Sequence, residues 1–325
     1  MTTHPPRVPL GHFPTPLHEL PRLRLALGGP RLLIKRDDLT GLAAGGNKVR
    51  KLEYLVADAL HQGAQTLITT GAAQSNHVCQ TAAAAARYGL GCVLVLGGVA
   101  PAHTTGNVLL DRLLGAHLRW AGQRDTYALM EEVAQEERAA ARKPYLIPVG
   151  GSNAIGAAAY VEAMAEMIRQ ARDLEARVDH VIVASGSGGT QAGLMVGASA
   201  HHFAGRVWGI SVSQPAAALR QTVADLAQLT AAFLDLRMPL DLAALTVNDD
   251  YLGEGYGVLG GAEREAIELV ARTEGLLLDP VYTGRAMAGL VDLVRRGAFG
   301  PQETVLFWHT GGLPALFAYA ESLTA

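Results

Sequence analysis

The feature that most constrains the fold is a regular alternation of strand-like and helix-like segments over residues 49–150. Short apolar runs, typical of buried strands, are separated by amphipathic stretches of about 10 to 15 residues, typical of helices. This spacing predicts right-handed βαβ units and a mostly parallel sheet, whose ligands bind beyond the carboxyl ends of the strands. We therefore expect loops 71–75 and 97–104 to face a ligand. The expected elements are helices over 49–62, 75–88, 105–115 and 126–142, and strands over 66–70, 92–96, 117–121 and 145–149.

The rest of the chain continues the alternation. An FPTP stretch at 13–16 predicts extended backbone, because each proline biases the residue before it away from helix. At 325 residues the chain is longer than one compact core usually sustains, so we expect one large domain or two closely packed ones. The further helices are expected over 20–27, from 150–153 to about 172, from Gln191, and over 216–234, 262–274, 285–296 and 313–323, with strands over 31–38, 181–184, 207–212, 245–247 and 304–308.

Composition excludes several functional classes. Hydrophobic residues make up 49% and charged residues 18%, which indicates a globular protein with a large core. A net charge of -3, without a basic run, argues against nucleic acid as a partner. No apolar run reaches the length of a membrane span and no secretory leader is evident. Cys79 and Cys92 have neither disulfide-rich nor metal-ligand spacing, so we expect no metal site and a cytoplasmic location.

A single lysine stands out as a candidate catalytic group. The stretch 45–53, GGNKVRKLE, places Lys48 between two glycines and an amphipathic helix. Burial and the neighbouring cations Arg50 and Lys51 would lower the pKa of its amine, which suits a nucleophile that attacks a carbonyl. An ordinary helix start with a solvated basic turn is the alternative that this stretch alone leaves open.

A second candidate is the loop Ser185-Gly186-Ser187-Gly188-Gly189-Thr190, which joins a strand to a helix. Backbone N–H groups and the positive end of a helix dipole make such a loop an anion site, and phosphate is its natural ligand. The loop matches neither a Walker A motif nor the Gly-x-Gly-x-x-Gly fingerprint of dinucleotide enzymes. A tight turn with nothing bound is the alternative.

Read together, these segments resemble a known family over residues 8–320. The segments are 45–48, 74–77, 185–190, Tyr256, 279–284 and 309–312. The sequence is similar to the pyridoxal-phosphate (PLP) enzymes of the tryptophan synthase β type (fold type II), in the branch of D-cysteine desulfhydrase and 1-aminocyclopropane-1-carboxylate (ACC) deaminase. The resemblance implies an α/β fold of two doubly wound, mostly parallel αβα domains with the cofactor in the cleft between them. It assigns 1–48 plus 155–325 to a large domain and 49–154 to a small one, and it implies a homodimer.

The resemblance also implies roles for individual residues. Lys48 would hold the cofactor as an internal aldimine, the glycine loop would hold its phosphate with Lys51 as an additional cation, and Asn76 would bind the phenolic oxygen. Ser75 would face the substrate. The implied cofactor-binding set is Asn47, Lys48, Lys51, Asn76, Gly186, Ser187, Gly188, Gly189, Thr190 and Thr310. The implied catalytic set is Lys48, Ser75, Tyr256 and Tyr282, and the implied substrate-binding set is Ser75, Asn76, His77, Tyr256, Tyr282 and Thr283.

Two threonines decide the expected reaction. In the deaminases a glutamate pairs with the pyridine nitrogen and an apolar residue precedes the final double glycine, whereas this chain has Thr283 and Thr310. A hydroxyl supports a weaker electron sink than a carboxylate does, which suffices when a good leaving group departs from the β-carbon. The expected activity is α,β-elimination on D-cysteine, a small amino-acid substrate, giving pyruvate, hydrogen sulfide and ammonia. L-Cysteate sulfo-lyase, ACC deaminase and a non-catalytic phosphate-binding or nucleotide-binding module remain alternatives, and the preference for D or L substrates stays open.

Overall fold

The computed structural model describes residues 5–242 and 244–324, and its strands form two separate sheets. The larger sheet has the order β1-β2-β10-β7-β8-β9, and the smaller has the order β5-β4-β3-β6. The strands are β1 Leu17–Glu19, β2 Arg31–Arg36, β3 Thr66–Gly71, β4 Gly91–Leu96, β5 His117–Trp120, β6 Pro144–Ile147, β7 His180–Ser185, β8 Arg206–Ser211, β9 Leu245–Asn248 and β10 Thr304–His309. Every pairing is parallel except that of β1 with β2. The expected α/β architecture with mostly parallel sheets is confirmed.

Twelve α-helices, counted over the described residues, connect and cover these strands. They are α1 Pro21–Leu27, α2 Lys48–His61, α3 Asn76–Arg87, α4 Gly106–Leu113, α5 Thr126–Ala139, α6 Ala154–Asp173, α7 Gly189–Ala200, α8 Ala216–Phe233, α9 Gly261–Glu274, α10 Thr283–Arg295, α11 Leu313–Ala318 and α12 Ala320–Thr324. Short 3₁₀ turns occupy Asp37–Leu39, Leu42–Ala44 and Val149–Gly151. None of the helices described is long and apolar enough to cross a bilayer.

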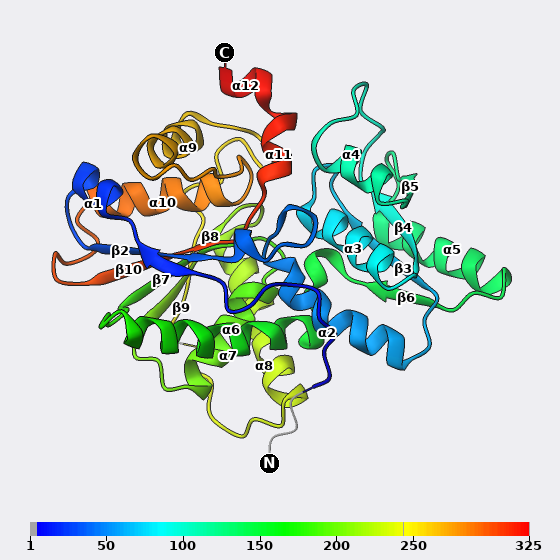
Figure 1. Ribbon diagram of the computed structural model, residues 1–325, viewed down its shortest axis with the longest axis horizontal. Coiled ribbons are helices and arrows are strands. Elements are labelled where there is room, and N and C mark those ends of the chain that lie inside the picture. Colours follow the sequence, from blue (N-terminus) through cyan, green and yellow to red (C-terminus); the bar gives the residue numbers. More distant parts are fainter. Residues whose placement is uncertain (1–4, 243, 325) are drawn as a thin grey trace.

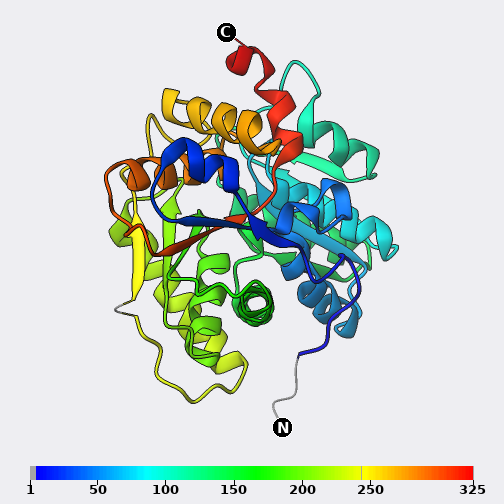
Figure 2. The ribbon, with the colours of Figure 1, turned by 60° about the vertical axis from the view of Figure 1, so that its left-hand side comes forward.

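The larger sheet is covered on both faces. In Figure 1, α1, α9 and α10 lie on one side of it and α6, α7 and α8 on the other, and the turned view of Figure 2 shows the same three layers. Successive residues of β7 alternate between the layers: Val181 and Val183 pack toward α6–α8, and Ile182 packs toward α10. This alternation follows from the two-residue period of a strand. Burial on both faces explains the almost continuous apolar run of β7.

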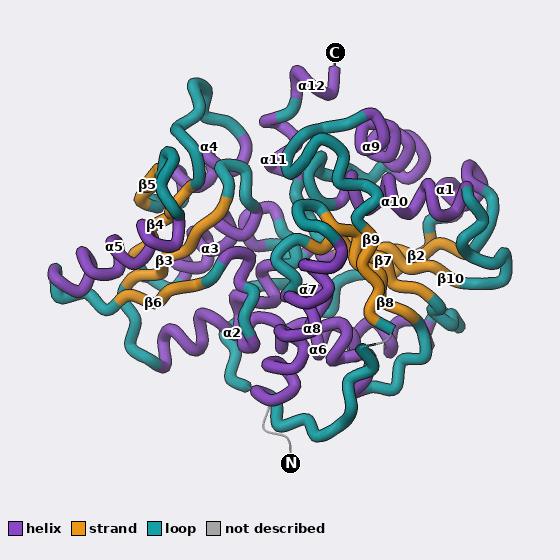
Figure 3. Tube along the Cα trace, turned by 180° about the vertical axis from the view of Figure 1, so that it is seen from behind, coloured by secondary structure: helices purple, strands orange, loops and turns teal. Residues whose placement is uncertain are grey.

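The smaller sheet is built in the same way. Leu67 belongs to the core that includes α2 and α3, whereas Ile68 packs toward α5 on the other face. Figure 3 shows the two sheets side by side, with α2 and α6 at the level of their junction. Helix α2 contacts both α3 and α6, so it joins the two halves of the molecule. We propose 49–154 as the smaller domain and the remainder as the larger one.

Two expectations differ from the structure. The segment before α1 contains an additional strand, β1, which is antiparallel and lies at the edge of the larger sheet. It pairs Leu17 with Lys35, and a pairing between residues this far apart in sequence is not predicted by local patterns. The single tail helix expected over 313–323 is two short helices that meet at Tyr319, whose hydroxyl donates to Gly257 O at 2.7 Å.

Candidate active site

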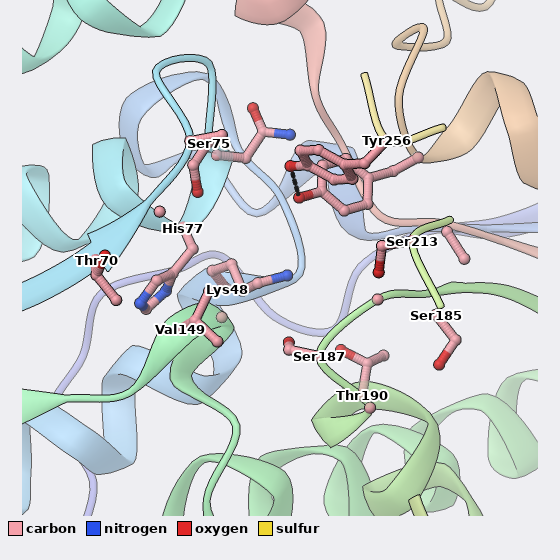
Figure 4. Close-up of a pocket in the computed structure, with 18 of the residues that line it drawn as sticks. Lys48, Thr70, Ser75, His77, Val149, Ser185, Ser187, Thr190, Ser213 and Tyr256 are labelled. Atoms are coloured by element: carbon pink, nitrogen blue, oxygen red, sulfur yellow. Dashed lines mark hydrogen bonds between the residues drawn. The ribbon is translucent and has the colours of Figure 1, made fainter. Parts of the chain in front are cut away.

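The carboxyl ends of strands from both sheets meet at a cavity of about 470 Å³. This volume lies within the range of about 300 to 1,000 Å³ that is usual for small-molecule sites. Figure 4 shows its walls, with Ser75 and His77 on one side and Ser185 and Ser187 on the other. Most predicted site residues line it, namely Asn47, Lys48, Ser75, Asn76, His77, Gly186, Ser187, Gly188, Thr190, Tyr256, Tyr282 and Thr310.

Lys48 is the first residue of α2, and its amine points into this cavity (Figure 4). The chain contains four lysines, and the other three are accounted for elsewhere. Lys35 is buried against the Glu166 carboxylate with an N–O distance of 2.5 Å, Lys51 lies behind the cavity wall, and Lys143 is exposed. The Lys48 Nζ donates to Asn47 Oδ1 at 3.0 Å.

Burial lowers the pKa of the Lys48 amine to about 8, and the Asp279 carboxylate opposes this shift. The expectation that Arg50 contributes to the lowering is wrong. The Arg50 guanidinium donates to the carboxylates of Asp37 and Glu166, on the other side of α2. Burial, rather than the neighbouring cations Arg50 and Lys51, lowers the pKa, and about a tenth of the Lys48 amine is uncharged at pH 7.

The loop between β7 and α7 provides the anion site that the sequence predicts. Gly188 has φ +81°, a conformation that favours glycine, and α7 begins at the next residue. A Cβ at Gly189 would lie 2.5 Å from Ser152 Oγ and 2.9 Å from Lys51 Nζ, so a side chain there would displace Ser152 and Lys51. The Gly189 N–H donates to Ser152 Oγ, and the N–H groups that follow it in the first helical turn have no acceptor within the helix and are available to an anion.

Lys51 and Gly189 do not line the cavity but lie directly behind this loop. The Lys51 Nζ donates to Gly150 O at 3.0 Å and to Ser152 Oγ at 3.2 Å. The same Ser152 Oγ accepts from Gly189 N at 3.2 Å and lies 2.7 Å from Ser187 Oγ. The lysine therefore supports the loop through Ser152. Burial, followed by the charge of Lys48, holds the pKa of the Lys51 amine well below its ordinary value.

The amino terminus of α3 forms the opposite wall. Ser75 is its N-cap, and its Oγ accepts from Val78 N at 3.4 Å. Asn76 and His77 form the first turn, whose backbone N–H groups suit a carboxylate. Burial, followed by the charges of Lys48 and Lys51, holds the pKa of His77 well below its usual range, so its imidazole is neutral.

Two tyrosines far apart in sequence meet at the cavity. The hydroxyl oxygens of Tyr256 and Tyr282 are 2.6 Å apart, and the rings pack edge to face with centroids 6.0 Å apart (Figure 4). Burial raises the pKa of Tyr282 well above its usual value. The Tyr282 hydroxyl is therefore protonated at neutral pH and can donate a hydrogen bond.

The two threonines that direct the choice of reaction differ in their placement. Thr310 lines the cavity, and its carbonyl accepts from Asn47 N at 3.0 Å. Thr283 is fully buried and does not line the cavity. Its hydroxyl donates to Asp279 Oδ1 at 2.7 Å and accepts from Asp279 N at 2.8 Å. The geometry thus gives no support to a direct substrate contact by Thr283.

Sequence reasoning missed Asp279 as a functional residue. Its carboxylate accepts from the backbone N–H groups of Val281, Tyr282 and Thr283 at 2.8–3.0 Å and so fixes the turn that carries Tyr282. The signal was present, because an aspartate followed by proline ahead of a helix is typical of a turn in which the side chain accepts from the backbone.

Ser213 and Gln214 were also missed, although they follow a predicted strand and both line the cavity. The Gln214 Nε2 donates to Gly186 O at 3.2 Å and supports the anion loop. The rule that ligands bind beyond the carboxyl ends of strands, applied to the strand expected over 207–212, could have found both.

The cavity and its lysine agree with what the chain is similar to. The model of the family described as "Pyridoxal-phosphate dependent enzyme" matches residues 8–311. The chain belongs to this family. A solved structure described as an ACC deaminase homologue is 41% identical, with a TM-score of 0.90, and the match covers 98% of this chain and 95% of the other.

Two more distant solved structures share the fold. An aspartate racemase is 18% identical, with a TM-score of 0.66 over 92% of this chain and 90% of the other. A fungal L-serine ammonia-lyase from Rhizomucor miehei is also 18% identical, with a TM-score of 0.68 over 95% of this chain and 96% of the other. Together with the family match, they confirm a fold type II PLP enzyme.

The residues present fit pyridoxal phosphate. A partly uncharged amine, an anion loop and a helix amino terminus face one cavity, as an aldehyde, a phosphate and a carboxylate require. In the same wall, the buried Ser185 Oγ has no hydrogen-bond partner among the residues that the structure describes, so it is available to a polar ligand. Lys48 would hold the aldehyde carbon, and Gly186–Thr190 with Lys51 would hold the phosphate.

Proposed function

We propose that this PLP enzyme is a lyase that removes hydrogen sulfide from D-cysteine and yields pyruvate and ammonia. The observation that carries the proposal is the placement of the Lys48 amine in the same cavity as the Tyr256–Tyr282 hydroxyl pair. One end of this arrangement accepts a proton, and the other holds a proton that a leaving group can take.

The charge of the cavity supports a small, uncharged leaving group. Among the described residues that line it, Lys48 is the only lysine or arginine, and His77 is neutral. A sulfonate needs cationic or amide donors beyond those that serve the phosphate and the carboxylate. A thiol group beside two tyrosine hydroxyls has no such need, which favours D-cysteine over L-cysteate.

The chain's own residues divide the elimination among them. The first turn of α3, with Ser75, binds the substrate carboxylate and orients the α-carbon. Bound pyridoxal phosphate supplies the electron sink that makes the α-proton acidic. Once the substrate's amino group has taken its place on the cofactor, the Lys48 amine is free, with a pKa of about 8, and takes that proton. The hydroxyl pair of Tyr256 and Tyr282 donates a hydrogen bond to the sulfur, which departs as the bond from the β-carbon breaks. The released three-carbon enamine then reacts with water to give pyruvate and ammonia.

A second candidate is ACC deaminase activity, favoured by the 41% identity to the structure described as an ACC deaminase homologue. Two observations argue against it: positions 283 and 310 are threonines, and no aspartate or glutamate is among the described residues that line the cavity. Assays for pyruvate, sulfide, sulfite and 2-oxobutanoate on D-cysteine, L-cysteine, L-cysteate and the cyclopropane acid separate all the candidates. Release of 2-oxobutanoate from the cyclopropane acid would overturn the proposed reaction.

The role of Lys48 is tested with two lysine variants. We expect Lys48→Ala to lose the yellow absorption of the lysine-bound cofactor and to reduce sulfide release by at least about a hundredfold. The exposed Lys143→Ala serves as the matched control and keeps both. Borohydride reduction followed by peptide mass spectrometry should place the cofactor on the peptide that contains Lys48. A cofactor found on Lys51 instead would refute the assignment.

We further propose that the protein acts as a cytoplasmic homodimer. Exposed apolar side chains on α4 and α11 support a contact between copies, since these helices pack on each other at the surface. These side chains belong to Leu109, Leu113, Leu313 and Phe317. Light scattering coupled to size-exclusion chromatography measures the mass, and a monomer at micromolar concentration would contradict the proposal.

A further inference from the structure

Asn107 lies outside the cavity wall but is tied to it through Asn76. It is in the first turn of α4 and is 1% exposed. Its side-chain Nδ2 donates to Gln74 O at 2.9 Å and to Asn76 Oδ1 at 2.9 Å. Asn76 lines the cavity, whereas Asn107 does not.

These contacts fix which way the Asn76 amide faces. A backbone carbonyl only accepts, so the Asn107 atom beside Gln74 O must be its NH₂ group. The second hydrogen of that group then requires an acceptor, and the Asn76 atom beside it must be Oδ1. The Asn76 NH₂ group is therefore turned away from Asn107, and both of its hydrogens are available elsewhere.

Asn107 is itself held rigidly, so it cannot adapt to a flipped Asn76. Its backbone N–H donates to Gln74 Oε1 at 2.8 Å, and Gln74 Nε2 donates to Thr105 O at 3.1 Å. Gly106 lies between Thr105 and Asn107 and has φ +57°, and a Cβ on it would lie 2.9 Å from Pro314 O. The turn, the glutamine and Asn107 thus form one fixed unit beside the cavity.

We infer that Asn107 is a positioning residue that makes Asn76 a hydrogen-bond donor toward the cavity. A donor at that position stabilises a negatively charged oxygen, such as the ring oxygen of pyridoxal phosphate. This inference rests on the proposed function only in so far as the bound ring lies against Asn76. Through Asn107, helix α4 would thus determine that Asn76 presents a hydrogen-bond donor, and not an acceptor, to the cavity.

The test uses Asn107→Asp and Asn107→Ala, each alone and combined with Asn76→Ala. An ionised aspartate of the same shape only accepts, so it reverses the amide of Asn76 and presents Oδ1 to the cavity. Alanine removes the constraint without adding a charge. Asn248→Ala, a change at a partly exposed asparagine bonded to Asp250, is the matched control.

The readout is the pH at which the visible band of the lysine-bound cofactor loses half its intensity. The band is lost when the nitrogen that joins Lys48 to the cofactor gives up its proton. Loss of this proton concentrates negative charge on the ring oxygen, so removing a hydrogen-bond donor to that oxygen raises the pH at which the proton is lost. We expect the midpoint to rise by about one pH unit in Asn107→Asp and by less in Asn107→Ala. We also expect affinity for pyridoxal phosphate to fall by about tenfold in Asn107→Asp.

The double variants separate positioning from a structural role. In the Asn76→Ala background, the changes at Asn107 should leave the midpoint where Asn76→Ala alone puts it. A midpoint equal to that of wild type in Asn107→Ala, or an undiminished shift in the double variant, would overturn the inference. If Asn107→Asp does not fold, Asn107→Ala decides. If the wild-type protein shows the visible band of the lysine-bound cofactor but releases no sulfide from D-cysteine, the proposed reaction is wrong. The test of Asn107 remains valid in that case, because it measures only the pH midpoint of the band.

Discussion

Asp111 of α4 is a fully buried carboxyl group with an unusual environment. Neither of its oxygens has a hydrogen-bond partner of good geometry among the described residues. Burial raises its pKa from an ordinary value of 3.8 to about 7, and contact with the Cys79 thiol lowers it by less. The negative charge of Asp111 adds to burial in raising the pKa of Cys92 to about 12. The surroundings thus favour a neutral carboxyl group beside neutral thiols.

This raised pKa makes the folded state less stable as pH rises. The unfolded chain loses the Asp111 proton near pH 4, whereas the folded chain keeps it until about pH 7, so folding takes up a proton between these values. The stability that Asp111 contributes is complete below pH 4 and falls until pH 7. Each tenfold change in proton affinity corresponds to about 1.4 kcal/mol, so the full loss is about 4 kcal/mol.

Asp111→Asn removes this dependence because an amide does not titrate in this range. We expect the difference in unfolding free energy between the variant and wild type to grow by about 2.5 kcal/mol in favour of the variant between pH 5 and pH 8. Urea unfolding of both proteins at the two pH values measures it, and all other groups cancel in the comparison. A difference that is the same at both pH values would show that the carboxyl group has an ordinary pKa and would refute the reasoning.

Three further predictions concern groups around the cavity. Arg285→Gln removes the cationic partner of the buried Glu263 carboxylate, whose Oε1 lies 2.7 Å from Arg285 Nε. The change should lower the free energy of unfolding, measured in urea, by about 3 to 5 kcal/mol, and Arg285→Lys should lower it by less. Asp279→Asn removes the charge that raises the pKa of Lys48, so the pH midpoint of the reaction of Lys48 with an aldehyde should move below 8; a midpoint that rises would contradict this. Gly189→Ala places a Cβ 2.5 Å from the Ser152 hydroxyl oxygen. It should weaken the binding of pyridoxal phosphate by about tenfold and leave the binding of pyridoxal, which has no phosphate, unchanged. Equal losses of affinity for both compounds would contradict a phosphate site.

Much of the fold could be predicted because its strands carry their own signal. A strand buried on both faces, such as β7, reads as a continuous apolar run, and helices of regular length separate it from its parallel neighbours. The antiparallel strand β1 could not be found in this way. It is three residues long, and its pairing with β2 depends on contacts that no local pattern reports.

The site was predictable where position along a strand decides it and less so where side-chain direction decides it. Lys48 and the loop after β7 follow from the carboxyl-end rule. Helical geometry predicts the direction of Arg50, because residues three apart share a face of a helix, whereas residues two apart do not. Lys48 and Lys51 therefore lie on the cavity side of α2, and Arg50 points away. That Thr283 turns toward Asp279 depends on a folded turn, which spacing alone does not reveal.

The contacts of Arg50 explain why the Lys48 amine has a fixed position. On one side of α2, Arg50 donates to Asp37, in the 3₁₀ turn that follows β2, and to Glu166 of α6. Asp37 also accepts from Trp308 Nε1 at 2.8 Å. On the other side, Lys51 is bonded to the carbonyl of Gly150 and to Ser152. A buried ion pair adds little net stability over an apolar contact, but it permits few arrangements, and removing one partner leaves a costly unpaired charge. The first turn of α2 is thus fixed on both faces, and Lys48, on the same side of the helix as Lys51, points into the cavity.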